Sequence, residues 1–87
     1  MQTNSKQQYY LDKLQEEAAE LIQAVSKIRR FGPDNKHPER NTTNLEEFVG
    51  EIEDVLALLA CLEGEQLFDL NNSQDNILNK IKSVYKN

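Results

Sequence analysis

Apolar residues recur at steps of three and four along most of the chain, which is the period of an amphipathic helix. The pattern predicts one long helix over residues of about 6–30, a second over 44–62 and a third over 74–86. A polar loop over 31–43 separates the first two, because it contains the Gly-Pro pair and the second proline of the chain. The three apolar stripes consist of Leu11, Leu14, Ala18, Leu21, Val25 and Ile28, of Leu45, Phe48, Val49, Ile52, Val55, Leu56, Leu59 and Leu62, and of Ile77, Ile81 and Val84.

These stripes, with no strand-type alternation between them, predict an all-α fold in a single domain over residues 1–87. Asn44 is the expected N-cap of the second helix, and residues 65–70 are a candidate for a short extra helix. Cys61 lies in an apolar run and is expected in the core. A chain of this size buries only roughly 60–65% of its unfolded surface, so we expect oligomerisation to complete the core.

The net charge and the hydropathy of the chain indicate which kinds of binding partner are unexpected. The formal net charge is −5, from 15 acidic against 10 basic residues, and this argues against binding to a nucleic-acid polymer. No apolar stretch has the length of a membrane span, and the polar N-terminus carries no apolar signal segment. We therefore expect a soluble, cytoplasmic protein with no membrane partner.

Two pairs of acidic residues at helical spacing are the candidate chemical site. Glu17 and Glu20 share one face of the first helix, and Glu51 and Asp54 share one face of the second. No Lys or Arg stands three or four residues after any of these acids, so none has an ion-pair partner on the following turn of its helix. A hard cation such as Mg²⁺ is the natural complement, and carboxylate-held Mg²⁺ commonly serves phosphate chemistry. The alternative is a charged, solvated helix surface.

Other metal sites do not fit the sequence. A di-iron bundle needs Glu-x-x-His on two helices, whereas the single histidine, His37, lies in the loop. The acidic Ca²⁺ loop of an EF-hand is also absent from the sequence. Lys27, Arg30 and Lys36 lie near the end of the first helix and are candidates for contact with a phosphate, with ordinary solvated charge as the alternative.

Two acidic motifs of the chain are Glu-Glu-Ala-Ala-Glu at 16–20 and Glu-Ile-Glu-Asp at 51–54. In this order they resemble the EExxE…ExxD signature of the MazG-like all-α nucleoside triphosphate pyrophosphohydrolases. The resemblance covers residues of about 11–62. It implies a compact helical bundle completed by dimerisation, as a homodimer or a homotetramer. It also implies Mg²⁺-dependent hydrolysis of NTPs or dNTPs to a nucleoside monophosphate and pyrophosphate, with Mn²⁺ as a substitute ion.

The same resemblance assigns roles to five acids. Four of them would be metal ligands, and the fifth, Glu16, matches the first acid of the motif and would orient a water or a further ion. The metal ligands implied by the resemblance are Glu17, Glu20, Glu51 and Asp54. Phe31 or Tyr85 is a candidate for stacking on the base, although packing is the more common role of such residues.

Two alternatives stay open at this stage. One is a dUTPase- or dCTPase-like specialist within the same superfamily. The other is a non-enzymatic helical dimerisation module, since the stripe of the first helix is spaced like a coiled-coil seam.

Overall fold

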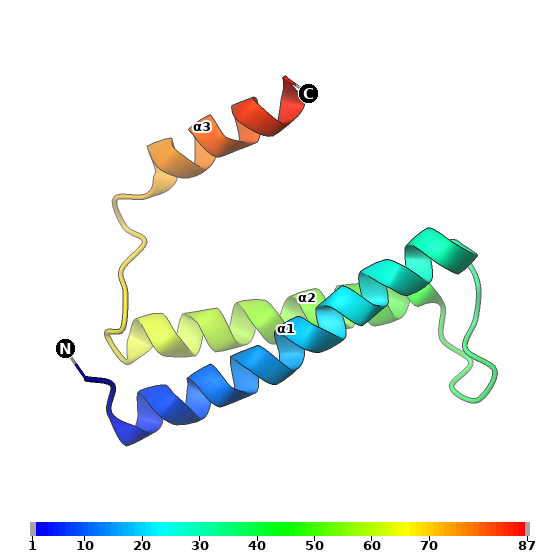
Figure 1. Ribbon diagram of the computed structural model, residues 1–87, viewed down its shortest axis with the longest axis horizontal. Coiled ribbons are helices and arrows are strands. Elements are labelled where there is room, and N and C mark those ends of the chain that lie inside the picture. The colour runs from blue at the N-terminus through cyan, green and yellow to red at the C-terminus, as the bar shows by residue number, and fades with distance from the viewer. Residues whose placement is uncertain (1, 87) are drawn as a thin grey trace.

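The structure, a computed structural model, describes residues 2–86 and contains three α-helices (Figure 1). They are α1 (Ser5–Phe31), α2 (Asn44–Gly64) and α3 (Gln74–Tyr85). Helices α1 and α2 lie side by side as an antiparallel pair, and α3 stands apart from both (Figure 1). The predicted all-α fold is confirmed, and the three predicted helices have nearly the expected limits.

Both long helices begin with a capping box, in which a side chain and a backbone amide satisfy each other at the first turn. The Asn4 side-chain oxygen accepts from the Gln7 amide at 2.8 Å, and the Thr43 hydroxyl accepts from the Glu46 amide at 3.0 Å. The predicted N-cap at Asn44 is therefore wrong by one residue. Asn44 is buried instead, and its side-chain amide donates to the Gly32 carbonyl at 3.0 Å. This bond ties the start of α2 to the end of α1.

The loop after α1 is largely exposed and folds back on itself. Gly32 ends the helix with φ of +88°, a backbone conformation that favours glycine. The amide of His37 donates to the Thr42 carbonyl at 2.8 Å, and Lys36 forms an isolated antiparallel bridge with Thr43. The loop therefore returns toward the start of α2.

The short helix expected over residues 65–70 does not form. Gln66 takes a left-handed backbone conformation, with φ of +63°, and so interrupts helical geometry directly after α2. The Glu63 side chain then accepts from the Leu70 amide at 2.8 Å. The result is an extended connection that carries α3 away from the helix pair (Figure 1).

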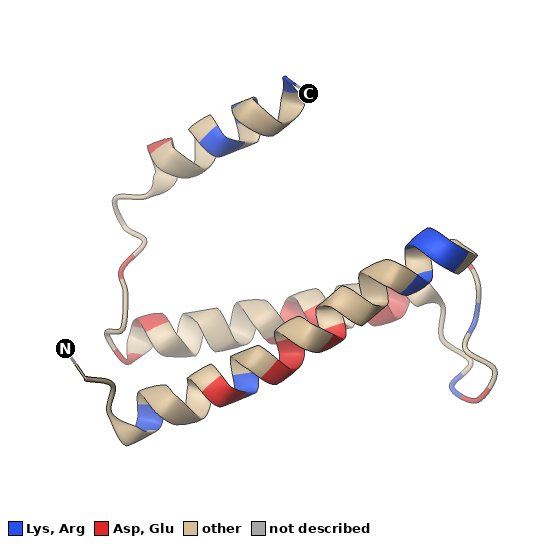
Figure 2. Cartoon of the chain, in the orientation of Figure 1, with Lys and Arg blue, Asp and Glu red and all other residues tan. Residues whose placement is uncertain are grey.

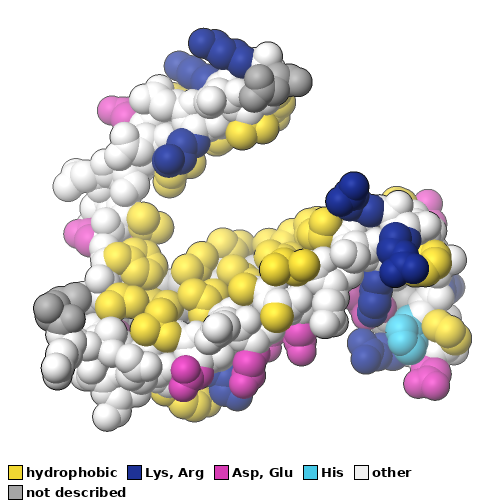
Figure 3. Space-filling view, in the orientation of Figure 1, with side chains coloured by type: hydrophobic (Ala, Val, Ile, Leu, Met, Phe, Trp, Pro, Cys, Tyr) yellow, Lys and Arg dark blue, Asp and Glu magenta, His cyan; other side chains and the backbone are white. Residues whose placement is uncertain are grey.

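The core between α1 and α2 is thin. Within residues 2–86, the buried hydrophobic side chains are Ala24 and Leu62. The expected burial of Cys61 is wrong, because its side chain lies on an exposed part of α2. The described part of α3 makes no contact with α1 or α2. Figure 3 shows apolar side chains both on α3 and on the facing side of the helix pair, so a large apolar surface stays uncovered in the single chain.

The helices give no indication of a membrane span. None of those within residues 2–86 combines the length and the apolar composition that crossing a bilayer needs.

Candidate metal centre

The middle of the helix pair brings three of the predicted acids together. Glu17 of α1 faces Glu51 and Asp54 of α2, and one carboxylate oxygen from each lies within 4.8 Å of the others. Acidic residues in the central part of both helices are visible in Figure 2. The antiparallel packing of α1 on α2 therefore converts two helical spacings into one cluster.

Two oxygens of this cluster are buried without a hydrogen-bond partner. They are Oε2 of Glu17 and Oε2 of Glu51, and neither meets a donor among the described residues. A buried carboxylate oxygen without a donor is costly in free energy. Oxygen ligands of this type are the ones that Mg²⁺ and other hard divalent cations prefer. The residues present therefore fit a hard divalent cation.

The electrostatic state of Glu51 reflects the same crowding. Burial is the largest cause that raises the pKa of Glu51, and together with the neighbouring carboxylates of Glu17 and Glu20 it brings this pKa from its ordinary value of 4.5 to about 7. When one carboxylate of the cluster is ionised, its negative charge disfavours the ionisation of a neighbouring carboxylate. A bound cation would relieve both effects, because it offsets the negative charge and coordinates the buried oxygens.

This raised pKa predicts how the stability of the metal-free protein depends on pH. Glu51 holds its proton more tightly in the folded chain than in the unfolded chain. Its contribution to stability is therefore complete below about pH 4.5 and is lost as the pH rises through about 7. We expect the melting temperature in EDTA to fall between about pH 4.5 and pH 8. Glu51→Gln should show a smaller fall, and an equal fall in both proteins would contradict the assignment to Glu51.

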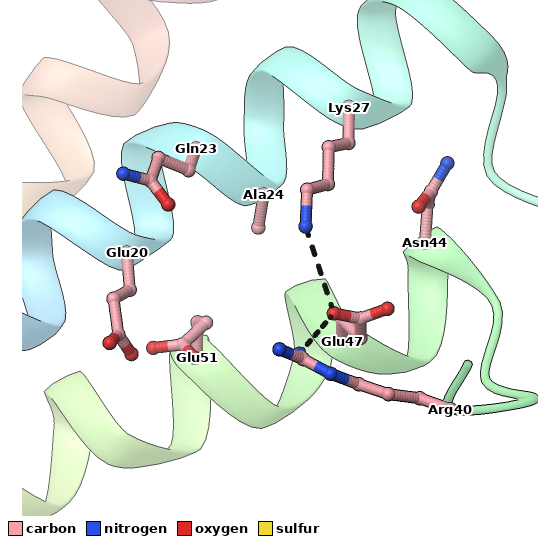
Figure 4. A pocket seen from close by; sticks show the side chains of 8 residues that line it. All are labelled: Glu20, Gln23, Ala24, Lys27, Arg40, Asn44, Glu47 and Glu51. Atoms are coloured by element: carbon pink, nitrogen blue, oxygen red, sulfur yellow. Dashed lines mark hydrogen bonds and ion pairs between the residues drawn. The ribbon is translucent and has the colours of Figure 1, made fainter. Parts of the chain in front are cut away.

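The fourth predicted ligand, Glu20, lies next to the cluster. It is exposed on α1 and borders, together with Glu51, a hollow of about 150 Å³ (Figure 4). Its side chain points toward Glu51 across the helix pair (Figure 4). Glu16 lies elsewhere, on an exposed part of α1, with its carboxylate 4.0 Å from the Lys13 ammonium. The structure thus brings together Glu17, Glu51 and Asp54, with Glu20 beside them.

The far wall of this hollow is cationic. The carboxylate of Glu47 lies 3.9 Å from the Lys27 ammonium and 3.2 Å from the Arg40 guanidinium (Figure 4). The Thr42 hydroxyl donates to the other Glu47 oxygen at 3.2 Å. Two cations thus share one carboxylate at the edge of the acidic cluster, which leaves positive charge available to an anion.

Of the three basic residues predicted from the sequence, only Lys27 borders this hollow. Arg30 lies 5.3 Å from the Phe31 ring, and Lys36 belongs to the bridge with Thr43. Sequence reasoning missed Arg40, because only the returning loop brings it to Glu47. The one sequence signal was the length of the loop, since long connections often carry functional residues.

The helix pair holds buried carboxylate oxygens without hydrogen-bond donors, and two cations lie beside them. This combination is suited to metal-assisted chemistry on phosphates in an all-α protein. The family model of the MazG nucleotide pyrophosphohydrolase domain matches residues 5–87, and the chain belongs to this family. No curated protein and no solved structure gives a significant match. Membership supports nucleotide pyrophosphohydrolase activity, a hydrolase reaction, in general terms.

Proposed function

We propose that this chain hydrolyses nucleoside triphosphates, NTPs or dNTPs, to the nucleoside monophosphate and pyrophosphate with Mg²⁺, for which Mn²⁺ substitutes. The ligands would be Glu17, Glu20, Glu51 and Asp54. The observation that carries the proposal is the pair of buried carboxylate oxygens without donors inside a cluster of three acids. Mg²⁺ bound there would supply positive charge to the phosphates and activate a water for attack on the α-phosphorus.

The four proposed ligands differ in their burial, and we infer different roles from this difference. Glu17 and Glu51 are partly buried on opposite helices, so the packing of α1 on α2 holds their separation. Asp54 and Glu20 are exposed and therefore accessible to a substrate. Lys27 would contact a phosphate, and Arg30 and Lys36 remain candidates farther out. Glu16, at the first position of the motif, would orient a water from the exposed edge.

A panel of substrates tests the reaction directly. Purified protein with Mg²⁺ is incubated with the common NTPs and dNTPs, including dUTP and dCTP, and the products are separated by chromatography. We expect the monophosphate and pyrophosphate in equal amounts. Release of single phosphate would overturn the reaction, and turnover of dUTP or dCTP alone would favour the specialist alternative.

Metal binding separates the enzyme from a helical interaction module. A cation that binds only the folded chain stabilises it by about 2.7 kcal/mol at a hundredfold excess over Kd. For a domain of this size, 1 kcal/mol raises the melting temperature by about 4–8 °C. We expect Mg²⁺ to raise the melting temperature of the wild type by several degrees and that of Glu17→Gln much less. An interaction module would show no such increase in either protein.

The exposed apolar face of α3 supports a homo-oligomer, either a homodimer or a homotetramer. Ile77, Ile81, Val84 and Tyr85 line an apolar hollow on α3, and this face does not touch the chain's own helix pair. The helix pair exposes apolar residues in turn, including Ile22 at 68% and Leu56 at 59% exposure. Exposed apolar surface of this extent commonly marks an interface. We expect α3 of one protomer to pack against a second copy of the chain, which completes the single domain of each.

A further inference from the structure

The carboxylate cluster lies in the middle of a longer row of side chains where α1 and α2 meet. On α1, positions 10, 13, 17, 20, 24 and 27 follow one another at steps of three and four, so they share a face. On α2, positions 44, 47, 51, 54 and 58 do the same in the opposite direction. Hollows adjoin the cluster at both ends of this row.

The two hollows have different chemistry. The hollow of about 150 Å³ is lined by Lys27, Arg40 and Glu47 next to Glu20 and Glu51. The second hollow, of about 310 Å³, shares the cluster through Glu17 and Asp54. Its remaining walls are Tyr9, Tyr10, Lys13, Ala57 and Leu58.

The second hollow suits a flat aromatic ligand. The rings of Tyr9 and Tyr10 lie edge to face, with centroids 5.7 Å apart. Tyr10 and Leu58 are partly buried, so they offer firm apolar walls. Stacking of a base on an aromatic side chain contributes about 1–3 kcal/mol and is tolerant of base identity. Neither Phe31 nor Tyr85, the aromatic candidates from the sequence, lines this hollow.

We propose that the nucleotide lies along this row in one direction, with its base against Tyr10 and Tyr9 and its β- and γ-phosphates toward Lys27 and Arg40. This inference rests on the proposed function. The α-phosphate then lies at the carboxylate cluster, between the two hollows. From Tyr10 to Glu17, and again from Glu20 to Lys27, the helix rises about 10 Å, so each end of a nucleotide has its own section of the row.

The direction follows from where charge leaves during hydrolysis. The oxygen of water forms a bond to the α-phosphorus, and the bond from that phosphorus to the bridging oxygen breaks. The electron pair departs with pyrophosphate, and the proton of the water passes to solvent. Pyrophosphate therefore leaves beside Lys27 and Arg40, whose charge stabilises it. The reverse direction would place that charge against Tyr9, Tyr10 and Leu58. The lining there offers one cation, Lys13, in place of two, and its ammonium already lies 4.0 Å from the Glu16 carboxylate.

Glu47 is a positioning residue in this arrangement. Its side chain is largely buried, at 17% exposure, and it contacts both cations. It therefore holds the Lys27 ammonium and the Arg40 guanidinium on the same side of the hollow. Phosphate oxygens would share these two cations with Glu47 when the substrate binds.

Binding of the two products, each alone with Mg²⁺, separates the two ends of the row. We expect Tyr10→Ala to weaken the binding of the nucleoside monophosphate by about ten- to a hundredfold, and the binding of pyrophosphate by less than about twofold. Arg40→Ala should weaken the binding of pyrophosphate by about tenfold or more and leave the binding of the monophosphate nearly unchanged. Tyr10→Phe, which keeps the ring, should retain monophosphate binding. Isothermal calorimetry measures the binding of both products to the wild type and to each variant, and circular dichroism checks that each variant is folded.

Arg29→Ala is the matched control for Arg40, because Arg29 is exposed on α1 and lies outside both hollows. The opposite pattern, in which Arg40→Ala weakens only the monophosphate, would overturn the direction, as would equal weakening of both products by Tyr10→Ala. A wild type that binds both products but hydrolyses no triphosphate would count against the proposed function and not against this direction. An active wild type without the expected split would overturn the direction alone.

Discussion

Replacing Glu17 with glutamine is expected to lower the turnover of nucleoside triphosphates by at least about a hundredfold. Glu17 is the only member of the acidic cluster contributed by α1, and its Oε2 is buried without a donor. Glutamine keeps the size of the side chain but replaces one carboxylate oxygen, a proposed metal ligand, with an amide NH₂. A catalytic metal contributes several kcal/mol to the stabilisation of the transition state. Each 1.4 kcal/mol is a factor of ten in rate, which sets the expected loss.

The measurement is the rate of pyrophosphate release at saturating substrate and Mg²⁺, with helical content checked by circular dichroism. Asp54→Asn should show a loss of similar size, because it removes a proposed ligand from the other helix. Glu53→Gln is the control, since Glu53 carries the same charge on α2, is exposed and lies outside the cluster. Undiminished turnover in folded Glu17→Gln would show that the cluster is not the catalytic site.

Replacing Ile81 with aspartate is expected to dissociate the proposed homo-oligomer into monomers. Ile81 lies in the apolar hollow of α3 and is 45% exposed in the single chain. Burying such a side chain contributes about 1.5–3 kcal/mol, and a buried, unpaired carboxylate would be strongly unfavourable in its place. The effect is repeated at every symmetry-related copy of the interface. Sedimentation at several protein concentrations measures the change in mass.

Asn79→Asp is the matched control for this substitution. It introduces the same charge on α3, two residues earlier and outside the apolar hollow. We expect Asn79→Asp to keep the mass of the wild-type assembly. A wild type that sediments as a monomer at all concentrations would overturn the proposed interface, and so would an Ile81→Asp variant with unchanged mass.

The sequence predicted most of the secondary structure because the signals for it are local. The apolar period covered α1, α2 and α3, and the Gly-Pro pair marked the end of α1. The errors occurred where a single backbone conformation or a distant partner decided the outcome. Gln66 turns left-handed after α2, and Asn44 bonds to Gly32 in the preceding loop, so Thr43 takes the cap. Neither event has a periodic signature.

In the candidate site, too, some features follow from local sequence and others from tertiary packing. By itself, the sequence determined which acids share a helix face, because a spacing of three residues on a helix leaves no other arrangement. Only the tertiary structure decided that Glu17, more than Glu20, meets Glu51 and Asp54, because this depends on how far α1 and α2 slide along each other.

Contacts between distant segments set that register. The Gln7 side chain donates to the Glu65 carbonyl at one end of the helix pair, and Asn44 donates to Gly32 at the other. The folded loop then delivers Arg40 to Glu47. Helix faces are thus a property of neighbouring residues, whereas the pairing of the carboxylates and the cationic wall beside them depends on long-range packing.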